Sequence, residues 1–120
     1  MKVPPTLYRD YYSLSTLILS RNQLSELPYE LGFLYNLREL YLDHNRISRF
    51  PDAVGQLTNL EVLDLSHNQL PFLDISLTNL TSLRVLDVSY NHLMTIPSYV
   101  GLLQDSLVAF HIRGNPFTKL

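Results

Sequence analysis

The residues of this sequence best suited to chemistry are carboxylates and histidines that recur at one spacing. Asp64 and Asp87 are 23 residues apart, and so are His44 and His67. Two neighbouring carboxylates can serve as a general acid and a general base. Two histidines beside a carboxylate such as Asp43 can hold a metal ion. The same side chains can also contact a partner, and what positions them decides between these possibilities.

Composition excludes several other classes of function. The chain has 120 residues, 46% of them hydrophobic and 17% charged, with a net charge of -2. This balance supports one packed domain and argues against disorder. Lys and Arg do not outnumber Asp and Glu, so nucleic-acid binding is not expected. The absence of cysteine excludes disulfides, thiol nucleophiles and cysteine-ligated zinc. The sequence shows neither a membrane-spanning apolar stretch nor the apolar run of a signal peptide.

The 23-residue spacing extends through the whole chain. Five asparagines, at positions 22, 45, 68, 91 and 115, are separated by 23, 23, 23 and 24 residues. Apolar residues recur at the same distances around each: Leu14, Leu17, Leu19, Leu24 and Leu27; Leu37, Leu40, Leu42, Ile47 and Phe50; Leu60, Leu63, Leu65, Leu70 and Leu73; Leu83, Leu86, Val88, Leu93 and Ile96; Leu107, Phe110, Ile112, Phe117 and Leu120. Chance would fill all these positions about once in 10⁸ to 10⁹ trials. A structural repeat therefore positions the candidate residues.

Each repeat contains a segment that indicates a short strand. Leu17 and Leu19 alternate with outward-facing residues, but the segment is too short to be stable alone. Stacking on its equivalents gives it backbone partners and a shared apolar interior. Each Asn follows the strand, where the chain turns inward and backbone groups lose their sheet partners. A buried Asn can bond to those groups in its own and the adjacent turn, and each would cost ~1–3 kcal/mol if unpaired.

This pattern, L-x-x-L-x-L-x-x-N-x-L-x-x-L, resembles the leucine-rich repeat family from Leu14 to Leu120. The resemblance implies an α/β fold: a right-handed solenoid of about five repeats, with short parallel strands on the concave side and short helical or extended returns on the convex side. The 23-residue length and the Leu-Pro returns look most like the intracellular Ras-group subclass. That likeness implies a cytoplasmic location and partners such as small GTPases or phosphatases.

The period also sets the expected domain organisation, a single domain over residues 1–120. Residues 1–13 form an N-terminal cap or half-repeat, in which 6–12 are expected to be helical. The repeats are expected at 14–36, 37–59, 60–82, 83–106 and 107–120, the last incomplete. The chain ends on an apolar position of the repeat, so we expect a segment of a longer protein or an end covered by a partner.

Proline marks most of the return segments. Leu27-Pro28, Phe50-Pro51 and Ile96-Pro97 occupy equivalent places, and proline favours the start of a helical turn. We therefore expect short α- or 3₁₀-helices there. The third return, 73–76, has neither proline nor glycine and is expected to be more extended. The fourth return holds one extra residue, which is placed near Gln104-Asp105.

Residues between the strand leucines are predicted to line the concave face, in columns with neighbours about 4.8 Å apart. The predicted partner-binding residues are Glu39, Tyr41, Asp43, His44, Asp64, His67, Asp87, Tyr90, His111 and Arg113. The centre of this set is acidic and aromatic, so a protein partner with a basic contact surface is expected. The competing surface is the convex side, with Tyr29, Tyr35 and Tyr99. Most tyrosines outside the concave face are nevertheless expected to pack around the returns and the N-terminal cap.

An interaction module or scaffold without catalysis is the predicted function. An open sheet offers no pocket for an acid–base pair, and the sequence contains neither a glycine-rich phosphate loop nor a serine elbow. No cofactor or metal is expected. One alternative is a targeting domain of a larger signalling protein or enzyme, such as a kinase, ubiquitin ligase or nuclease, whose activity lies elsewhere. Another is an extracellular recognition domain, which would require a secretion signal.

Overall fold

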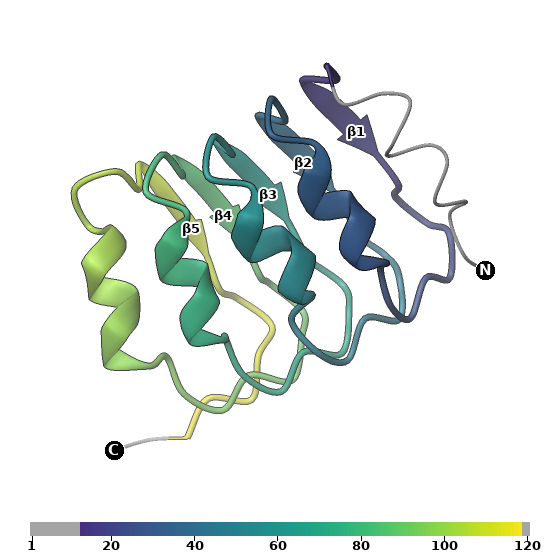
Figure 1. Cartoon of the computed structure of the whole chain (residues 1–120). Coiled ribbons are helices and arrows are strands. Elements are labelled where there is room, and N and C mark those ends of the chain that lie inside the picture. The colour runs from purple at the N-terminus through teal and green to yellow at the C-terminus, as the bar shows by residue number, and fades with distance from the viewer. Residues whose placement is uncertain (1–12, 119–120) are drawn as a thin grey trace.

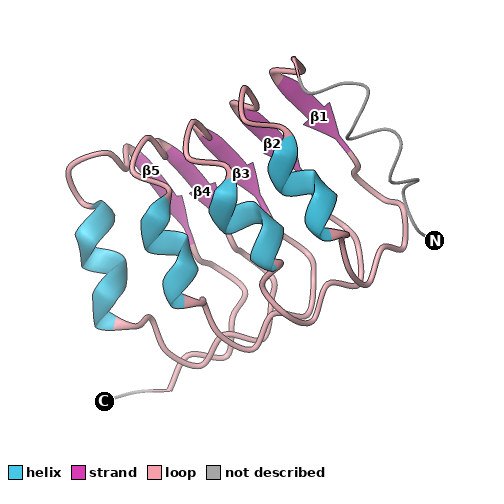
Figure 2. Ribbon diagram, in the orientation of Figure 1, coloured by secondary structure: helices cyan, strands magenta, loops and turns pink. Residues whose placement is uncertain are grey.

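The structure is a computed structural model, and it describes residues 13–118. The predicted N-terminal helix and the apolar position of Leu120 lie outside these residues. Short strands alternate with 3₁₀-helices (Figure 1): β1 Thr16–Ile18, η1 Tyr29–Phe33, β2 Glu39–Tyr41, η2 Asp52–Gln56, β3 Val62–Asp64, η3 Ile75–Asn79, β4 Val85–Asp87, η4 Ser98–Leu103 and β5 Ala109–His111. The strands line one side of the molecule and the helices line the other (Figure 2). Among residues 13–118, no helix is both long and apolar enough to span a membrane.

The five strands form one parallel sheet in sequence order, β1-β2-β3-β4-β5. Leu17 pairs with Leu40, which pairs with Leu63, so each strand is in register with its equivalent in the next repeat. The extra residue of the fourth return does not disturb this register, because Leu86 pairs with Phe110. The predicted columns of the sheet are therefore confirmed, and the fold is the expected leucine-rich repeat solenoid.

The apolar core lies between the strands and the helices. The strand and return leucines of the middle repeats, such as Leu63 and Leu77, are completely buried. The end repeats are less closed: Leu14 and Leu19 at one end and Phe110 at the other are only partly buried against the core. Phe117, at an apolar position of the last repeat, is 37% exposed. A repeat needs a neighbour on each side to bury its apolar residues completely.

The predicted asparagine ladder is confirmed in the middle repeats. The amide nitrogen of Asn68 donates to the carbonyls of Leu42 (2.9 Å), Leu65 (3.1 Å) and Ser66 (3.2 Å). Its oxygen accepts from the backbone N–H of Ile47 (2.9 Å). The side chain thus satisfies backbone groups in its own turn and the preceding one. Asn45 and Asn91 are also buried, whereas the ladder's two end members, Asn22 and Asn115, are half-buried.

The third return contradicts its prediction, because it forms η3 rather than an extended segment. Asp74 takes the place that Pro28 holds before η1, with φ -73° and ψ 151° against -71° and 155°. Its carboxylate accepts a hydrogen bond from the backbone N–H of Ser76 (3.0 Å) and so caps the helix. This bond holds the pKa of Asp74 below its ordinary value. A capping carboxylate therefore replaces the fixed φ of proline.

The fourth return confirms the expected place of its extra residue. The helix η4 has 6 residues, where η1, η2 and η3 have 5. Gln104 continues in helical conformation after it, and residues 104–106 form a turn. The N–H of Leu107 returns to the carbonyl of Leu103 at 2.9 Å, which closes this turn before β5. The insertion is thus absorbed at the surface of the solenoid.

Candidate functional site

The outward side chains of the strands and of the turns that follow them form one surface, which we call the sheet face. Glu39 pairs with Val62 across β2 and β3, and Tyr41 pairs with Asp64. Asp64 in turn pairs with Asp87. The sheet thus places the candidate carboxylates in adjacent repeats, although they are far apart in sequence. This is the face that the sequence predicted to be concave.

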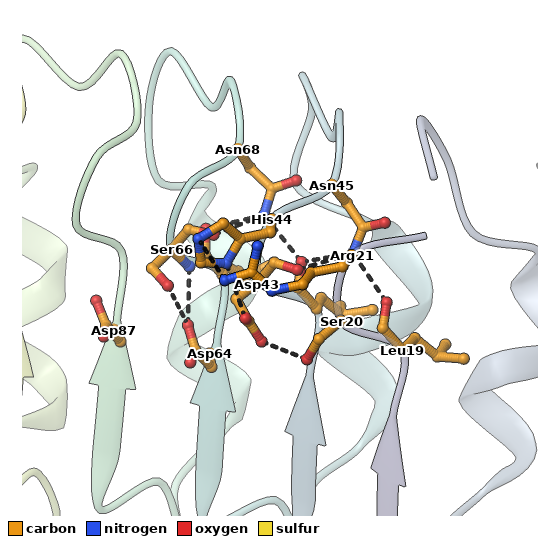
Figure 3. Close-up of polar contacts among 12 residues, drawn as sticks. Leu19, Ser20, Arg21, Asp43, His44, Asn45, Asp64, Ser66, Asn68 and Asp87 are labelled. Carbon is orange, nitrogen blue, oxygen red and sulfur yellow. Dashed lines mark hydrogen bonds and ion pairs between the residues drawn. The ribbon is translucent and has the colours of Figure 1, made fainter. Parts of the chain in front are cut away.

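Serines orient the two central aspartates, and Figure 3 shows the pair of Ser66 and Asp64. The hydroxyl of Ser66 donates to Oδ1 of Asp64 at 2.6 Å, and the N–H of Ser66 donates to the same oxygen at 2.9 Å. Ser89 holds Asp87 in the same way, at 2.6 Å and 3.0 Å. Both serines are buried. One oxygen of each carboxylate is therefore fixed, and the other makes no hydrogen bond within the part of the chain that the structure describes.

Asp43 and Asp64 have opposite electrostatic environments, although they lie in adjacent repeats. Burial raises the pKa of Asp64, and the nearby Asp43 and Asp87 add to the rise, outweighing the hydrogen bonds from Ser66. Burial also acts on Asp43, but hydrogen bonds from Ser20 (2.6 Å) and His44 (3.0 Å) bring its pKa below the ordinary value. The folded protein thus favours the charged form of Asp43 and disfavours the charged form of Asp64.

Tyr41 and Glu39 form a second polar pair on the sheet face. The hydroxyl of Tyr41 donates to Oε1 of Glu39 at 2.8 Å. This bond, burial and the charges of Glu39 and Asp64 raise the pKa of Tyr41, so the hydroxyl remains a neutral donor. Glu61 lies near the start of β3, where it contacts Arg38 at 2.7 Å and Arg84 at 3.9 Å. That edge is therefore partly neutralised, and the unneutralised acidic charge is concentrated nearer Asp64.

A column of stacked rings runs along the carboxyl ends of the strands. The ring of His44 stacks on His67 with centroids 4.1 Å apart and planes at 12°. His67 stacks on Tyr90 at 4.5 Å and 14°. Arg113 covers the other side of Tyr90, 5.6 Å from its centroid, and Nη2 of Arg21 lies 3.5 Å from Nε2 of His44. We call His44, His67 and Tyr90 the ring stack; it has an arginine at each end.

The backbone explains why these rings line up. Arg21, His44, His67 and Tyr90 each immediately precede a ladder asparagine, and all have φ between 56° and 58°. This left-handed conformation is unfavourable for side chains with a Cβ. The fifth equivalent is Gly114, with φ 75°. A Cβ there would lie 2.4 Å from Cδ1 of Tyr90, so glycine makes room for the last ring of the stack.

The geometry does not favour the two chemical alternatives. The lone pairs of imidazole nitrogens lie in the ring plane, so the parallel rings of His44 and His67 direct them alongside each other rather than toward one ion. No cluster of three potential ligands occurs in residues 13–118. Asp64 and Asp87 stand on a sheet face and line neither of the two grooves found on the return segments. The outward carboxylates and stacked rings form a surface that a partner can contact.

Within residues 13–118, most of the predicted site residues make side-chain hydrogen bonds or ring contacts with other residues of the sheet face, but His111 does not. Asp43 contacts His44, Tyr41 contacts Glu39, and the ring stack joins His67 and Tyr90 to Arg113. His111 pairs with Asp87 through the backbone, but its side chain makes no hydrogen bond or ring contact within the described residues. The predicted partner-binding set leaves out Arg21, Ser66 and Ser89, although the columns place them on this face, and it does not include the stacking. The sequence did contain a signal for the stacking: an aromatic ring or an arginine immediately precedes four of the five ladder asparagines.

Family comparisons agree with this architecture. Models of the leucine-rich repeat family match residues 13–34 and 35–93. The chain therefore belongs to the leucine-rich repeat family. A search of curated protein sequences found no match.

Several solved structures are similar to the whole chain. An internalin from Listeria monocytogenes str. 4b F2365 is 25% identical, with a TM-score of 0.81 over 99% of this chain and 34% of that one. Internalin C2 from the same strain is 29% identical, with a TM-score of 0.85 over 100% and 50%. The Arabidopsis receptor kinase HAESA, solved with the peptide hormone IDA and the co-receptor SERK1, is 32% identical, with a TM-score of 0.80 over 95% and 20%. The chain thus spans a fifth to a half of these proteins.

Proposed function

We propose that this chain is a protein-interaction module or scaffold, without catalysis of its own, whose sheet face binds a partner with a basic contact surface. The observation that carries the proposal is the acidic centre: Asp64 and Asp87 are adjacent and oriented by buried serines, and each retains one oxygen without a hydrogen bond to any residue in 13–118. Burial raises the pKa of Asp64, and repulsion from Asp43 and Asp87 adds to the rise; a lysine or arginine of a partner would offset both effects.

The ring stack supplies the second part of the proposed contact. Tyr90 is 40% exposed and is held on one side by His67 and on the other by Arg113. Rigid aromatic side chains contribute contact area at a low cost in conformational entropy. Four non-glycine residues keep a left-handed conformation at this edge, and such strain is commonly retained at functional sites. HAESA, a relative by structure, was solved bound to a peptide and a protein, which supports a binding role for the shared fold.

The finer assignments belong to the same proposal. The 23-residue repeat favours the Ras-group subclass, a cytoplasmic location, and a small GTPase or phosphatase as partner. The alternative is a targeting domain of a larger signalling protein or enzyme, and the small share of each similar structure that this chain spans supports it. In that case the sheet face would still bind the target, while the catalytic activity would reside in another domain.

The test is affinity capture from an extract of the cells that express the protein. The site variant is Tyr41→Ala/Asp64→Arg/Tyr90→Ala. The matched control on the helical side is Tyr29→Ala/Asp52→Arg/Tyr35→Ala, which makes the same three types of change. We expect the site variant to lose a protein that the wild type and the control retain. Loss of that same protein by the control alone would overturn the proposal, as would its equal retention by both variants.

A further inference from the structure

The first return differs from the other returns at its exposed positions. Tyr29, Phe33 and Tyr35 are exposed by 73%, 46% and 61%. The equivalent residues of the second, third and fourth returns are Asp52, Gln56 and Thr58; Ile75, Asn79 and Thr81; Ser98, Leu102 and Gln104. We call the three aromatic residues the aromatic patch. The expectation that tyrosines outside the sheet face pack around the returns is wrong for Tyr29 and Tyr35, whereas Tyr99 is half-buried and donates to the carbonyl of Leu73.

The repeat frame does not require aromatic residues at these positions. The helices η1 and η2 have the same length, and both end in a residue with nearly identical backbone angles: φ -82° and ψ 65° at Leu34, φ -87° and ψ 67° at Leu57. The second return builds this geometry with polar side chains. The aromatic patch therefore exposes apolar surface that folding does not use, and such surface marks interaction sites.

The aromatic patch borders a groove between η1 and η2. The groove has a volume of about 450 Å³, and its walls include Tyr29, Phe33 and Tyr35 on one side and Asp52, Ala53 and Gln56 on the other. Tyr29 and Phe33 meet edge to face, with centroids 6.0 Å apart. A second groove, of about 420 Å³, shares Tyr29, Asp52 and Ala53 with it. The two are thus neighbours along the same pair of returns, with room for large side chains.

Charge indicates what the apolar groove would accept. Asp52 is the charged residue among the described residues that line it, and it lines the neighbouring groove as well. It is exposed and has no hydrogen bond or ion pair to any residue in 13–118. The neighbouring groove is also lined by Glu26 and Arg49, whereas in the aromatic groove itself Asp52 stands beside exposed rings, an arrangement that favours a cation next to an apolar side chain.

We propose that the aromatic patch is a second docking surface, for a protein segment that inserts a large apolar side chain between η1 and η2 and places a lysine or arginine at Asp52. It lies on the helical side of the solenoid, away from the sheet face, so the two surfaces can be occupied together. The chain then joins two partners, and each surface can be disrupted without affecting the other.

A peptide selection tests this proposal before a natural partner has been identified. A phage library of random twelve-residue peptides is selected on the wild type and depleted on the variant Tyr29→Asp/Phe33→Gln/Tyr35→Thr, which gives the first return the residues of the second. The surviving consensus peptide is synthesised and its affinity measured. We expect a large apolar residue followed within a few positions by lysine or arginine. No surviving consensus, or one without a basic residue, would overturn the proposal.

Variants of the chain then locate the synthetic peptide. We expect the triple variant to bind at least about tenfold more weakly and Asp52→Asn several-fold more weakly at low salt, while Asp64→Arg binds like the wild type. If the triple variant does not melt cooperatively, the single variant Tyr35→Thr replaces it in this measurement. We expect Tyr35→Thr to bind the peptide more weakly than the wild type does. Equal binding by the patch variants, or loss only in Asp64→Arg, contradicts the proposal. So does self-association of the wild type that the triple variant abolishes, because a second copy would then occupy the groove.

Discussion

Two columns of side chains occupy adjacent positions in every repeat of this solenoid, but they point to different surroundings. The ladder asparagines are the same residue in every repeat, turn inward and bond to the backbone. The residues immediately before them vary from arginine to histidine, tyrosine and glycine, and they form the ring stack and its ends on the sheet face. One turn therefore supplies both a structural bond and a variable contact. If the proposed binding role of the ring stack holds, we expect substitutions in the two columns to affect stability and binding separately.

The largest loss of stability should come from a substitution in the apolar core, against which both columns are held. Leu63 is completely buried between its neighbours in β2 and β4. We expect Leu63→Ala to lower the free energy of unfolding by ~2–5 kcal/mol, because it leaves a cavity. Urea denaturation measures this loss. A loss below ~1 kcal/mol would show that the middle repeats are not tightly packed.

The next effect compares the two columns directly. We expect Asn68→Ala to lower the free energy of unfolding by ~1–3 kcal/mol, because backbone groups in two turns lose their partner. His67→Asn, one residue earlier, should change it by no more than ~0.5 kcal/mol, because asparagine tolerates the left-handed conformation. The second variant should instead weaken partner binding. Equal losses of stability in the two variants would contradict the separation of roles.

A smaller effect is expected where the variable column ends. Gly114→Ala introduces a Cβ at positive φ and against the ring of Tyr90, so we expect a loss of ~1–3 kcal/mol in the free energy of unfolding. NMR should also show displaced ring protons of Tyr90. Gly101→Ala is the matched control, since nothing lies within 4 Å of its Cβ. If both variants behave alike, Gly114 is not needed for the stack.

The smallest effect concerns the titration of Asp43 and Asp64. The pKa of Asp43 is lowered, so its stabilising contribution is present above the ordinary aspartate pKa and is lost as pH falls through the folded-state value. The pKa of Asp64 is raised in the folded protein. The free energy of unfolding therefore declines as pH rises from the ordinary aspartate pKa to the higher pKa of folded Asp64. Carboxyl NMR should give Asp64 the higher midpoint, and Asp64→Asn should be slightly stabilising at neutral pH. The reverse order of midpoints would refute the electrostatic account.

The period alone was enough to predict the strands, their register and the asparagine ladder, because these depend on residue types that recur. The third return was predicted wrongly because the prediction relied on proline as the sign of a helix start. Asp74 adopts the same backbone angles as proline does before η1, and its carboxylate caps η3.

The contacts of the sheet face could be predicted only in part. The columns placed Asp64 beside Asp87, but they put Arg113 in a different column from Tyr90, which its side chain covers in the structure. The ring stack depends on positive φ at His44, His67 and Tyr90 and on the identity of each neighbour. The binding surface is thus a property of adjacent repeats together, which the pattern of one repeat does not contain.

The central claim is that the sheet face holds a basic partner at Asp64. Its most direct test measures the affinity of the captured partner for the wild type, for Asp64→Arg and for Asp52→Arg, which makes the same charge reversal on the helical side. We expect Asp64→Arg to weaken binding several-fold to a hundredfold, ~1–3 kcal/mol, and Asp52→Arg to leave it within about twofold. Wild-type binding should weaken as salt rises. Intact binding by Asp64→Arg, with loss in Asp52→Arg, would contradict the account and assign the partner to the helical side.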